Sequence, residues 1–136
     1  MKFENALKPN KKQMEDFNLG DVGTPIYMIN LLKFKEKAIY EDGRDTNLSG
    51  PEAYTIYGQE VQNTHLQKVG GEGIYSGIIS RLMLGEIDEL WDWVAIVRYP
   101  SRQAMLEMIM DKDYQESEKH RSAGLKGQLN IESNKL

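Results

Sequence analysis

The chain has 136 residues, of which 40% are hydrophobic and 28% are charged, as expected for a single globular domain. Its formal net charge of -4 and the lack of a basic stripe argue against a nucleic-acid partner. The sequence contains no cysteine, which excludes disulfides, thiolate metal sites and a cysteine nucleophile.

The first residues carry charges with no apolar run between them, so we expect neither a signal peptide nor a membrane anchor. No segment approaches the roughly 20 apolar residues that a membrane-spanning helix needs. We therefore expect a cytoplasmic protein without a membrane partner.

The first predicted elements are a helix, a strand and a long loop. Residues 11–18 have apolar side chains at near-helical spacing, and Gly20 and Gly23 would end this helix. The nearly continuous apolar run of residues 24–34 predicts a strand. Residues 35–49 are charged and predict a long loop, which is either functional or plain surface.

A strong helix start follows at Ser49. The serine can cap the helix, Pro51 suits its first turn and Glu52 can close a capping box. The helix should continue to about Val69, where a double glycine stops it. The side chains expected on one side of this helix are Tyr54, Tyr57, Val61 and His65.

The next two predicted elements are strands. Residues 73–84 alternate loosely in polarity, which places Arg81 on one strand face with Ile79 and Met83. Residues 91–100 are rich in tryptophan, valine, isoleucine and tyrosine, and they predict the clearest strand of the chain.

Two helical segments and a last strand are expected after this point. Ser101 can cap a helix over residues 102–111, and a further helical segment over residues 111–121 should close at Gly124. Residues 125–132 alternate cleanly, which predicts a half-exposed strand. The residues expected on its apolar face are Leu125, Leu129 and Ile131.

The order strand, helix, strand, strand, helix, strand is the ferredoxin-like arrangement of an α+β domain. Two helices then cover one face of a four-stranded antiparallel sheet and leave the other face bare. Both faces of the predicted central strands are apolar, with Ile26, Met28, Leu32, Phe34, Trp91, Trp93, Val97 and Tyr99 opposite Tyr27, Ile29, Leu31, Val94 and Ile96.

A bare apolar face predicts a homodimer. Burying one large apolar side chain is worth ~1.5–3 kcal/mol, so an exposed row of them is unfavourable in a monomer. Two copies can bury these faces against each other by two-fold pairing. The competing explanation is that the N-terminal segment of the same chain folds over the bare face.

Six segments together resemble one known family. They are MINLLKF (28–34), YEDGRD (40–45), SGPEAYTIYG (49–58), VGGEGIYSG (69–77), ELWDWVAIVRYPSR (89–102) and DYQESEKHRSAGL (113–125). In their order and spacing they resemble the domain-of-unknown-function 1330 family of the dimeric α/β-barrel superfamily. The resemblance implies one ferredoxin-like domain over residues 25–136, whose sheet faces that of a second copy. It also implies a cleft between the sheet and the first long helix, and it leaves residues 1–24 as an unassigned N-terminal segment.

Several residues are candidates for binding a ligand in that cleft. Asn30 is the one strongly polar residue of its strand, and its amide can position a substrate oxygen or be satisfied by its neighbours. Tyr54 and Tyr57 can form an apolar wall with polar tips, and Trp93 can hold an aromatic ligand. The alternative for the two tyrosines is a role as core aromatics.

The charged candidates can likewise have either a ligand-binding or a structural role. Arg81 can clamp a carboxylate or phosphate, or it can pair with a nearby acid. Arg44, in the predicted long loop, can close over an anionic ligand or stay solvated. Tyr114 and Arg121, with His120, match a recurrent tyrosine and His-Arg pair of the family. They either line the mouth of the cleft or fasten the helical segment.

His65 and His120 are the candidate catalytic residues, because histidine can move a proton near neutral pH. Two histidines far apart do not form a metal site, and nothing supports a haem ligand. Dinucleotide, P-loop and serine-hydrolase motifs are missing, so we expect neither metal nor cofactor.

Three function classes follow from these residues. The first is a dimer that binds a small apolar or aromatic molecule without known catalysis. The second is a cofactor-independent oxygenase or isomerase acting on a small aromatic or carbonyl substrate. In that enzyme Asn30 and a tryptophan would hold the substrate, and one histidine would move the proton. The third is a structural or assembly module.

Overall fold

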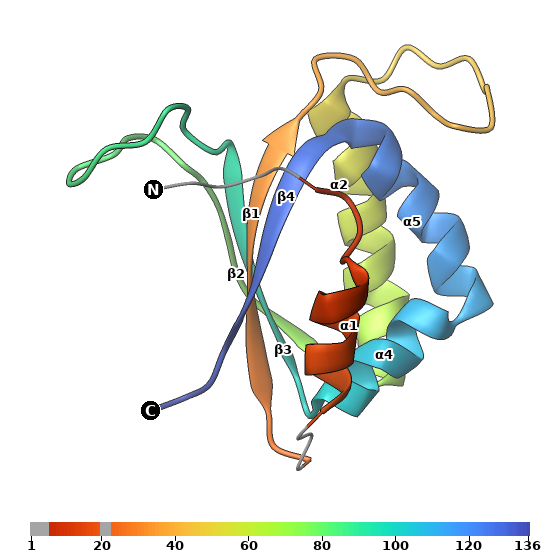
Figure 1. Ribbon diagram of the computed structural model, residues 1–136. Helices are drawn as coiled ribbons and strands as arrows, with labels where there is room; N and C mark the ends of the chain where they lie inside the picture. Colours follow the sequence, from red (N-terminus) through yellow and green to blue (C-terminus); the bar gives the residue numbers. More distant parts are fainter. Residues whose placement is uncertain (1–5, 20–22) are drawn as a thin grey trace.

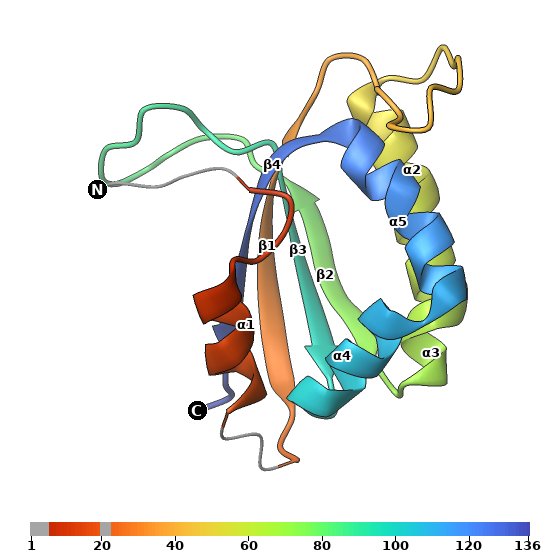
Figure 2. The same ribbon diagram turned by 45° about the vertical axis from the view of Figure 1, so that its right-hand side comes forward.

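The computed structural model describes residues 6–19 and 23–136. Its elements are α1 (Lys11–Asn18), β1 (Ile26–Phe34), α2 (Gly50–Glu60), the π-helical turn η1 (Val61–His65), α3 (Leu66–Lys68), β2 (Glu72–Ile78), β3 (Trp93–Tyr99), α4 (Arg102–Met110), α5 (Lys112–Gly124) and β4 (Leu125–Ser133). The four strands form one antiparallel sheet in the order β2-β3-β1-β4. The helices α2, α4 and α5 lie on one side of it (Figures 1 and 2). The predicted α+β fold is thereby confirmed.

The strand β1 lies inside the sheet, between β3 and β4. Its side chains alternate, and those that face the helices are buried almost completely, as at Ile26, Met28 and Leu32. Ile26 and Met28 join a core of residues from the helix layer and β3, which includes Val61, Leu66, Tyr99, Met108 and Tyr114. No helix within the described ranges is long and apolar enough to cross a membrane.

The helix α2 begins as the sequence predicts. The Ser49 hydroxyl accepts a hydrogen bond from the Glu52 amide at 3.1 Å, and the Glu52 carboxylate accepts one from the Ser49 amide at 2.9 Å. This capping box satisfies two amides that the first turn would otherwise leave unpaired. The predicted continuous helix is interrupted by η1, and it stops where Gly70 adopts a φ of +73°.

The predicted strand over residues 73–84 is too long. β2 ends at Ile78, opposite Trp93, the first residue of β3, and the chain leaves the sheet after one further hydrogen bond, from the Ile79 amide to the Asp92 carbonyl. Residues 79–90, called the arm below, leave the sheet and project from the side away from the helices (Figures 1 and 2). Arg81 is therefore an exposed arm residue, and its predicted place on a strand face is wrong.

The predicted apolar face of the last strand is also wrong in one respect. Leu125 is fully buried on the helix side, whereas Leu129 and Ile131 lie on the opposite face of the sheet. The pairing of β4 with β1 shifts register at this point, and Lys126 is the extra residue of a β-bulge. A bulge reverses the facing of the residues on either side of it, which simple alternation cannot anticipate.

The predicted N-terminal helix is present as α1. Asn10 caps it, and Phe17 packs against the core cluster on the helix side. Ala6 forms an isolated bridge with Gln128 at the edge of β4. Gly20, the first predicted helix stop, lies outside the described residues, and the division of the chain at residues 24 and 25 stays a prediction.

The face of the sheet opposite the helices is apolar. Within the described residues no helix lies on it (Figures 1 and 2). Its side chains remain at least partly exposed, and they come from all four strands. We call this surface the open face, and its apolar residues are Tyr27, Ile29, Leu31, Tyr75, Val94, Ile96, Leu129 and Ile131.

Candidate functional site

Aromatic side chains from both layers meet between the sheet and α2. The Phe34 ring of β1 lies 4.6 Å from Trp93 of β3 and 5.5 Å from Tyr54 of α2, centroid to centroid. Tyr54 also lies 5.3 Å from Tyr57, one turn further along the same helix. The structure thus brings three predicted ligand residues, Tyr54, Tyr57 and Trp93, into one cluster, which we call the aromatic cleft.

The rings of the aromatic cleft are partly exposed to solvent. Tyr54, Tyr57 and Trp93 all face the interior, yet each remains partly exposed. These rings stay partly exposed because α2 packs on α5 and leaves the helix-facing side of β2 uncovered. Ile78 on that side of β2 is 78% exposed. Burial of its hydroxyl raises the pKa of Tyr54 to about 12 and that of Tyr57 well above its ordinary value of 10. Both phenols are therefore neutral hydrogen-bonding groups at physiological pH.

Tyr114 lies at the inner end of the cluster. Its hydroxyl is 2.9 Å from the Tyr57 hydroxyl, and its ring makes an edge contact with His65 at 5.7 Å between centroids. Burial raises the pKa of Tyr114, and the hydrogen bond from Tyr57 opposes that rise. Tyr114 is buried among core residues, so it connects the aromatic cleft to the histidine behind it.

Asn30 has no unused hydrogen-bonding capacity for a ligand. Its amide nitrogen donates to the Ala95 carbonyl at 3.1 Å and to the Met28 carbonyl at 3.3 Å. Its amide oxygen accepts from Gln128 at 2.7 Å and from Asn130 at 2.5 Å. Four partners saturate a carboxamide. This geometry favours the structural alternative for Asn30.

Arg121 fastens α5 to two other segments. Its guanidinium donates to the Gln128 side chain at 2.6 Å, to Glu118 at 2.9 Å and to the Leu7 carbonyl at 2.8 Å. The side chain is mostly buried under the N-terminal segment and β4. These contacts favour the structural alternative for Arg121 as well.

A hollow lies on the outer surface, between α2, η1 and α5. It has a volume of about 370 Å³. We call it the outer groove, and its lining residues are Arg44, Glu60, Thr64, His65, Asp113, Glu116, Ser117 and His120. The structure therefore brings together both predicted catalytic histidines and Arg44, although they come from three separate segments.

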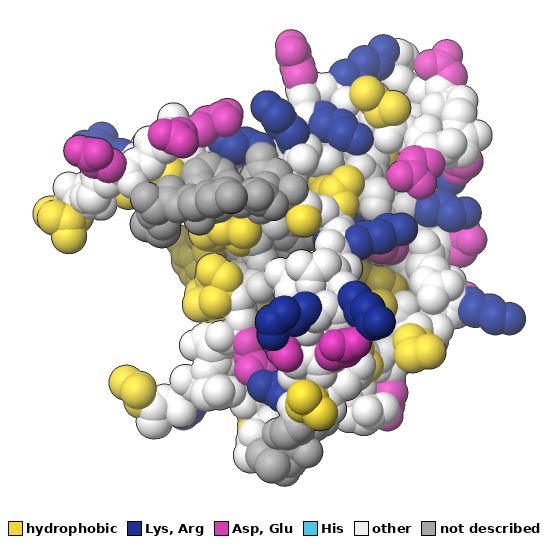
Figure 3. Space-filling view, viewed as in Figure 1, with side chains coloured by type: hydrophobic (Ala, Val, Ile, Leu, Met, Phe, Trp, Pro, Cys, Tyr) yellow, Lys and Arg dark blue, Asp and Glu magenta, His cyan; other side chains and the backbone are white. Residues whose placement is uncertain are grey.

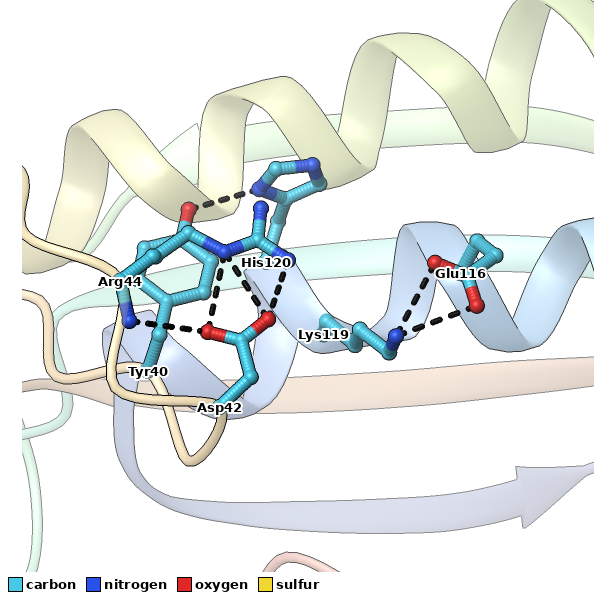
Figure 4. Close-up of polar contacts among 6 residues, drawn as sticks. All are labelled: Tyr40, Asp42, Arg44, Glu116, Lys119 and His120. Carbon is cyan, nitrogen blue, oxygen red and sulfur yellow. Dashed lines mark hydrogen bonds and ion pairs between the residues drawn. The ribbon is translucent and has the colours of Figure 1, made fainter.

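Each histidine of the outer groove is held by a hydroxyl. The Nε2 atom of His65 lies 2.8 Å from the Ser117 hydroxyl, and its Nδ1 is buried with no hydrogen-bond partner among the described residues. The Nδ1 atom of His120 lies 2.6 Å from the Tyr40 hydroxyl (Figure 4). Among the described residues no carboxylate accepts a hydrogen bond from His65, unlike the histidine of a complete catalytic triad.

Arg44 is committed to its own loop. Its guanidinium lies 4.5 Å from the Tyr40 ring centroid, and its Nε donates to both Asp42 carboxylate oxygens at 3.0 and 3.1 Å (Figure 4). These hydrogen bonds lower the pKa of Asp42 to about 2. With Glu60, Asp113 and Glu116 also in the groove, the charge there is unfavourable for an anion, which argues against the predicted closure of Arg44 over one.

Sequence reasoning missed Phe34 of the aromatic cleft, Tyr40 beside His120, and five lining residues of the outer groove, which are Glu60, Thr64, Asp113, Glu116 and Ser117. Tyr40 and Phe34 belong to segments that carried the family resemblance, but neither stood out from its neighbours. Ser117 has no sequence signal, because a serine in a polar helix is ordinary. No group of three or more histidine or acidic residues in the described part of the chain is placed to hold a metal ion.

Comparisons with known proteins place the chain among proteins of unknown function. A crystal structure of the methylated RPA0582 protein is 36% identical, covers 97% of this chain and 96% of its own, and has a TM-score of 0.86. A second structure, of RPA0582 from Rhodopseudomonas palustris, is 33% identical over 98% of each chain, again with a TM-score of 0.86. RPA0582 is described there as a protein of unknown function.

A more distant structure shares the fold alone. It is a dimeric protein of unknown function with a ferredoxin-like fold from Bacteroides fragilis, 10% identical over 80% of this chain and 94% of its own, with a TM-score of 0.51. No family model and no curated protein matches the chain, so the resemblance to the domain-of-unknown-function 1330 family stays a prediction. At 33–36% identity over nearly all of both sequences, the chain belongs to the family of the RPA0582 protein from Rhodopseudomonas palustris.

Proposed function

We propose that the chain acts as a homodimer that binds a small aromatic or apolar molecule in the aromatic cleft. The observation behind this proposal is that Tyr54, Tyr57 and Trp93 face the interior from two layers but remain partly exposed. Accessible rings with a few neutral polar tips are the usual lining of a small-molecule site.

The homodimer rests on the open face. Eight apolar residues of four strands are at least partly exposed there, and contiguous apolar patches of this kind are rare on monomers. The Bacteroides fragilis protein, which shares the fold, is described as dimeric. Face-to-face packing of two sheets would bury these residues and give the dimeric α/β barrel expected of the superfamily.

The two tryptophans provide a test of ligand binding. Trp93 lines the aromatic cleft, whereas Trp91 is buried beneath Lys33, whose ammonium lies 5.9 Å from its ring centroid. In the Trp91→Phe variant, Trp93 is the single fluorescent reporter. We expect members of a panel of small aromatic acids, phenols and indole to change this fluorescence. We also expect them to raise the melting temperature by about 5–10 °C at saturating concentration.

A second substitution identifies the site of binding. Tyr54→Leu in the same Trp91→Phe background removes one ring of the cleft, and we expect about tenfold weaker binding of each ligand found. The matched control is Trp93→Phe, which leaves only Trp91 as reporter and should show no ligand-dependent fluorescence. A panel without any effect on Trp93 fluorescence or on the melting temperature would contradict the small-molecule proposal.

The outer groove favours a second candidate, an enzyme that moves a proton without a cofactor. His65 and His120 both line it, and histidine can act as a general base near neutral pH. Its substrate would be a small carbonyl compound held outside the helix layer. Asn30 and Trp93 lie elsewhere, between the helices and the sheet, so they do not take part in this version of the enzyme.

Deuterium exchange tests the second candidate. In D₂O, we expect wild-type protein to exchange the C–H next to the carbonyl in at least one member of a panel of aromatic ketones and keto acids. His65→Asn and His120→Asn should each lower this rate at least 100-fold, whereas Arg81→Gln in the distant arm should not. Equal exchange by wild type and both histidine variants, measured by proton NMR, would exclude acid–base catalysis in the groove.

A further inference from the structure

The arm, residues 79–90, ends in a group of exposed apolar side chains. Met83 is 96% exposed and Leu84 is 90% exposed, and Leu82 and Ile87 are exposed beside them. The arm projects from the open-face side of the sheet, away from the helices (Figures 1 and 2). Figure 3 shows hydrophobic side chains at its far end and acidic side chains along it. Such a tip is unfavourable in water unless another surface covers it.

The base of the arm is held in place by the sheet. The Ile79 amide donates to the Asp92 carbonyl at 2.9 Å, and the Asp92 carboxylate accepts from the Phe34 amide at 2.8 Å. On the other side, the buried ammonium of Lys33 lies 3.0 Å from the Glu89 carboxylate and also donates to the Leu90 carbonyl. A base fixed in this way presents the tip at a defined place, which reduces the entropy lost on docking.

The tip and the open face lie on the same side of the sheet. A second copy that packs on the open face therefore also comes within the region into which the arm projects. The middle of that face carries only apolar side chains, and its charged residues, Lys33, Glu72 and Arg98, lie toward the two ends of the strands. In a two-fold dimer the contact between an arm and the other subunit occurs twice, because each subunit contributes one arm.

We propose that the arm of each subunit docks its apolar tip on the second copy and clasps the homodimer. This inference rests on the proposed homodimer and deepens it, because it assigns the exposed Leu82, Met83 and Leu84 to the partner surface. The arm contact is continuous with the sheet-to-sheet contact, and both are apolar. The occupant of the tip is thus a second copy of this chain.

Substitution of the tip tests the clasp. Met83→Asp places a charge in the proposed contact, and we expect the dimer dissociation constant to rise about tenfold or more, measured by sedimentation velocity. The matched control is Met110→Asp, since Met110 is 74% exposed at the end of α4, on the helix side. This control should dimerise as wild type does. Far-ultraviolet circular dichroism should be the same for both variants.

The lack of cysteine allows a second measurement that does not depend on affinity. A single cysteine introduced as Met83→Cys can carry a benzophenone maleimide, and irradiation should then give a covalent dimer. The same label on Met110→Cys should give monomer only. The clasp is wrong if wild type is dimeric, Met83→Asp has the dimer dissociation constant of wild type, and labelled Met83→Cys does not cross-link. The proposed homodimer would stand in that case. A wild-type chain that is monomeric overturns both.

Discussion

We expect Gly50→Ala to lower the free energy of unfolding by about 2–3 kcal/mol, or the melting temperature by roughly 10 °C. Gly50 is the first residue of α2, and there the backbones of three segments converge. A Cβ atom at this position would lie 2.7 Å from the Gly124 carbonyl oxygen and 2.9 Å from the Lys35 carbonyl carbon. Both neighbours are backbone atoms, so the helix ends must separate to make room.

The same helix provides the control for this prediction. A Cβ atom on Gly58 would have no neighbour within 4 Å, so Gly58→Ala should raise the free energy of unfolding by about 0.5–1 kcal/mol through better helix propensity. Gly124→Ala should behave as Gly50→Ala does, because its Cβ would meet the backbone of Gly50 and Tyr54. Thermal unfolding of the three variants checks this. Equal stability of Gly50→Ala and Gly58→Ala would show that the helices do not approach this closely.

Ile131→Asp is expected to convert the proposed homodimer into monomers. Ile131 is 46% exposed at the end of the open face, so an aspartate is tolerated in a single chain. In the dimer the same carboxylate would be buried twice, once in each subunit. Burying a polar group without a partner costs about 1–3 kcal/mol, and the dimer would bury two such carboxylates. The dimer dissociation constant should therefore rise about 100-fold or more.

Ile39→Asp is the control for Ile131→Asp. Ile39 is 65% exposed in the loop between β1 and α2, and its amide donates to the Ala123 carbonyl near the end of α5, on the helix side. This variant should keep the dissociation constant of wild type in sedimentation velocity. Dimers that persist in Ile131→Asp at the wild-type constant would show that the open face is not the interface. The arm would then also lose the surface on which it is proposed to dock.

Local signals in the sequence were sufficient for most elements. The α2 start was predicted correctly, because the groups that cap it, Ser49 and Glu52, lie three residues apart and act without the rest of the fold. The alternation of β1 was also predicted correctly, since burial on one face follows directly from the two-residue period of a strand.

The misplaced residues depend on partners that a sequence does not show. The end of β2 is set by the first residue of β3 that can pair with it, and the facing of Leu125 is set by a bulge opposite β1. The outer groove was unpredictable for the same reason. His65 meets Ser117 across 52 residues, and Tyr40 meets His120 across 80.

The sequence by itself determined the order of the elements, the capped helices and a sheet that is apolar on both faces, because each depends on interactions within a few residues. Only the tertiary structure decided which candidates share a site, that the Asn30 amide is saturated and Arg121 is held by its neighbours, and that residues 79–90 project from the sheet. Those outcomes depend on pairing and packing between distant segments, whose geometry follows from the whole fold.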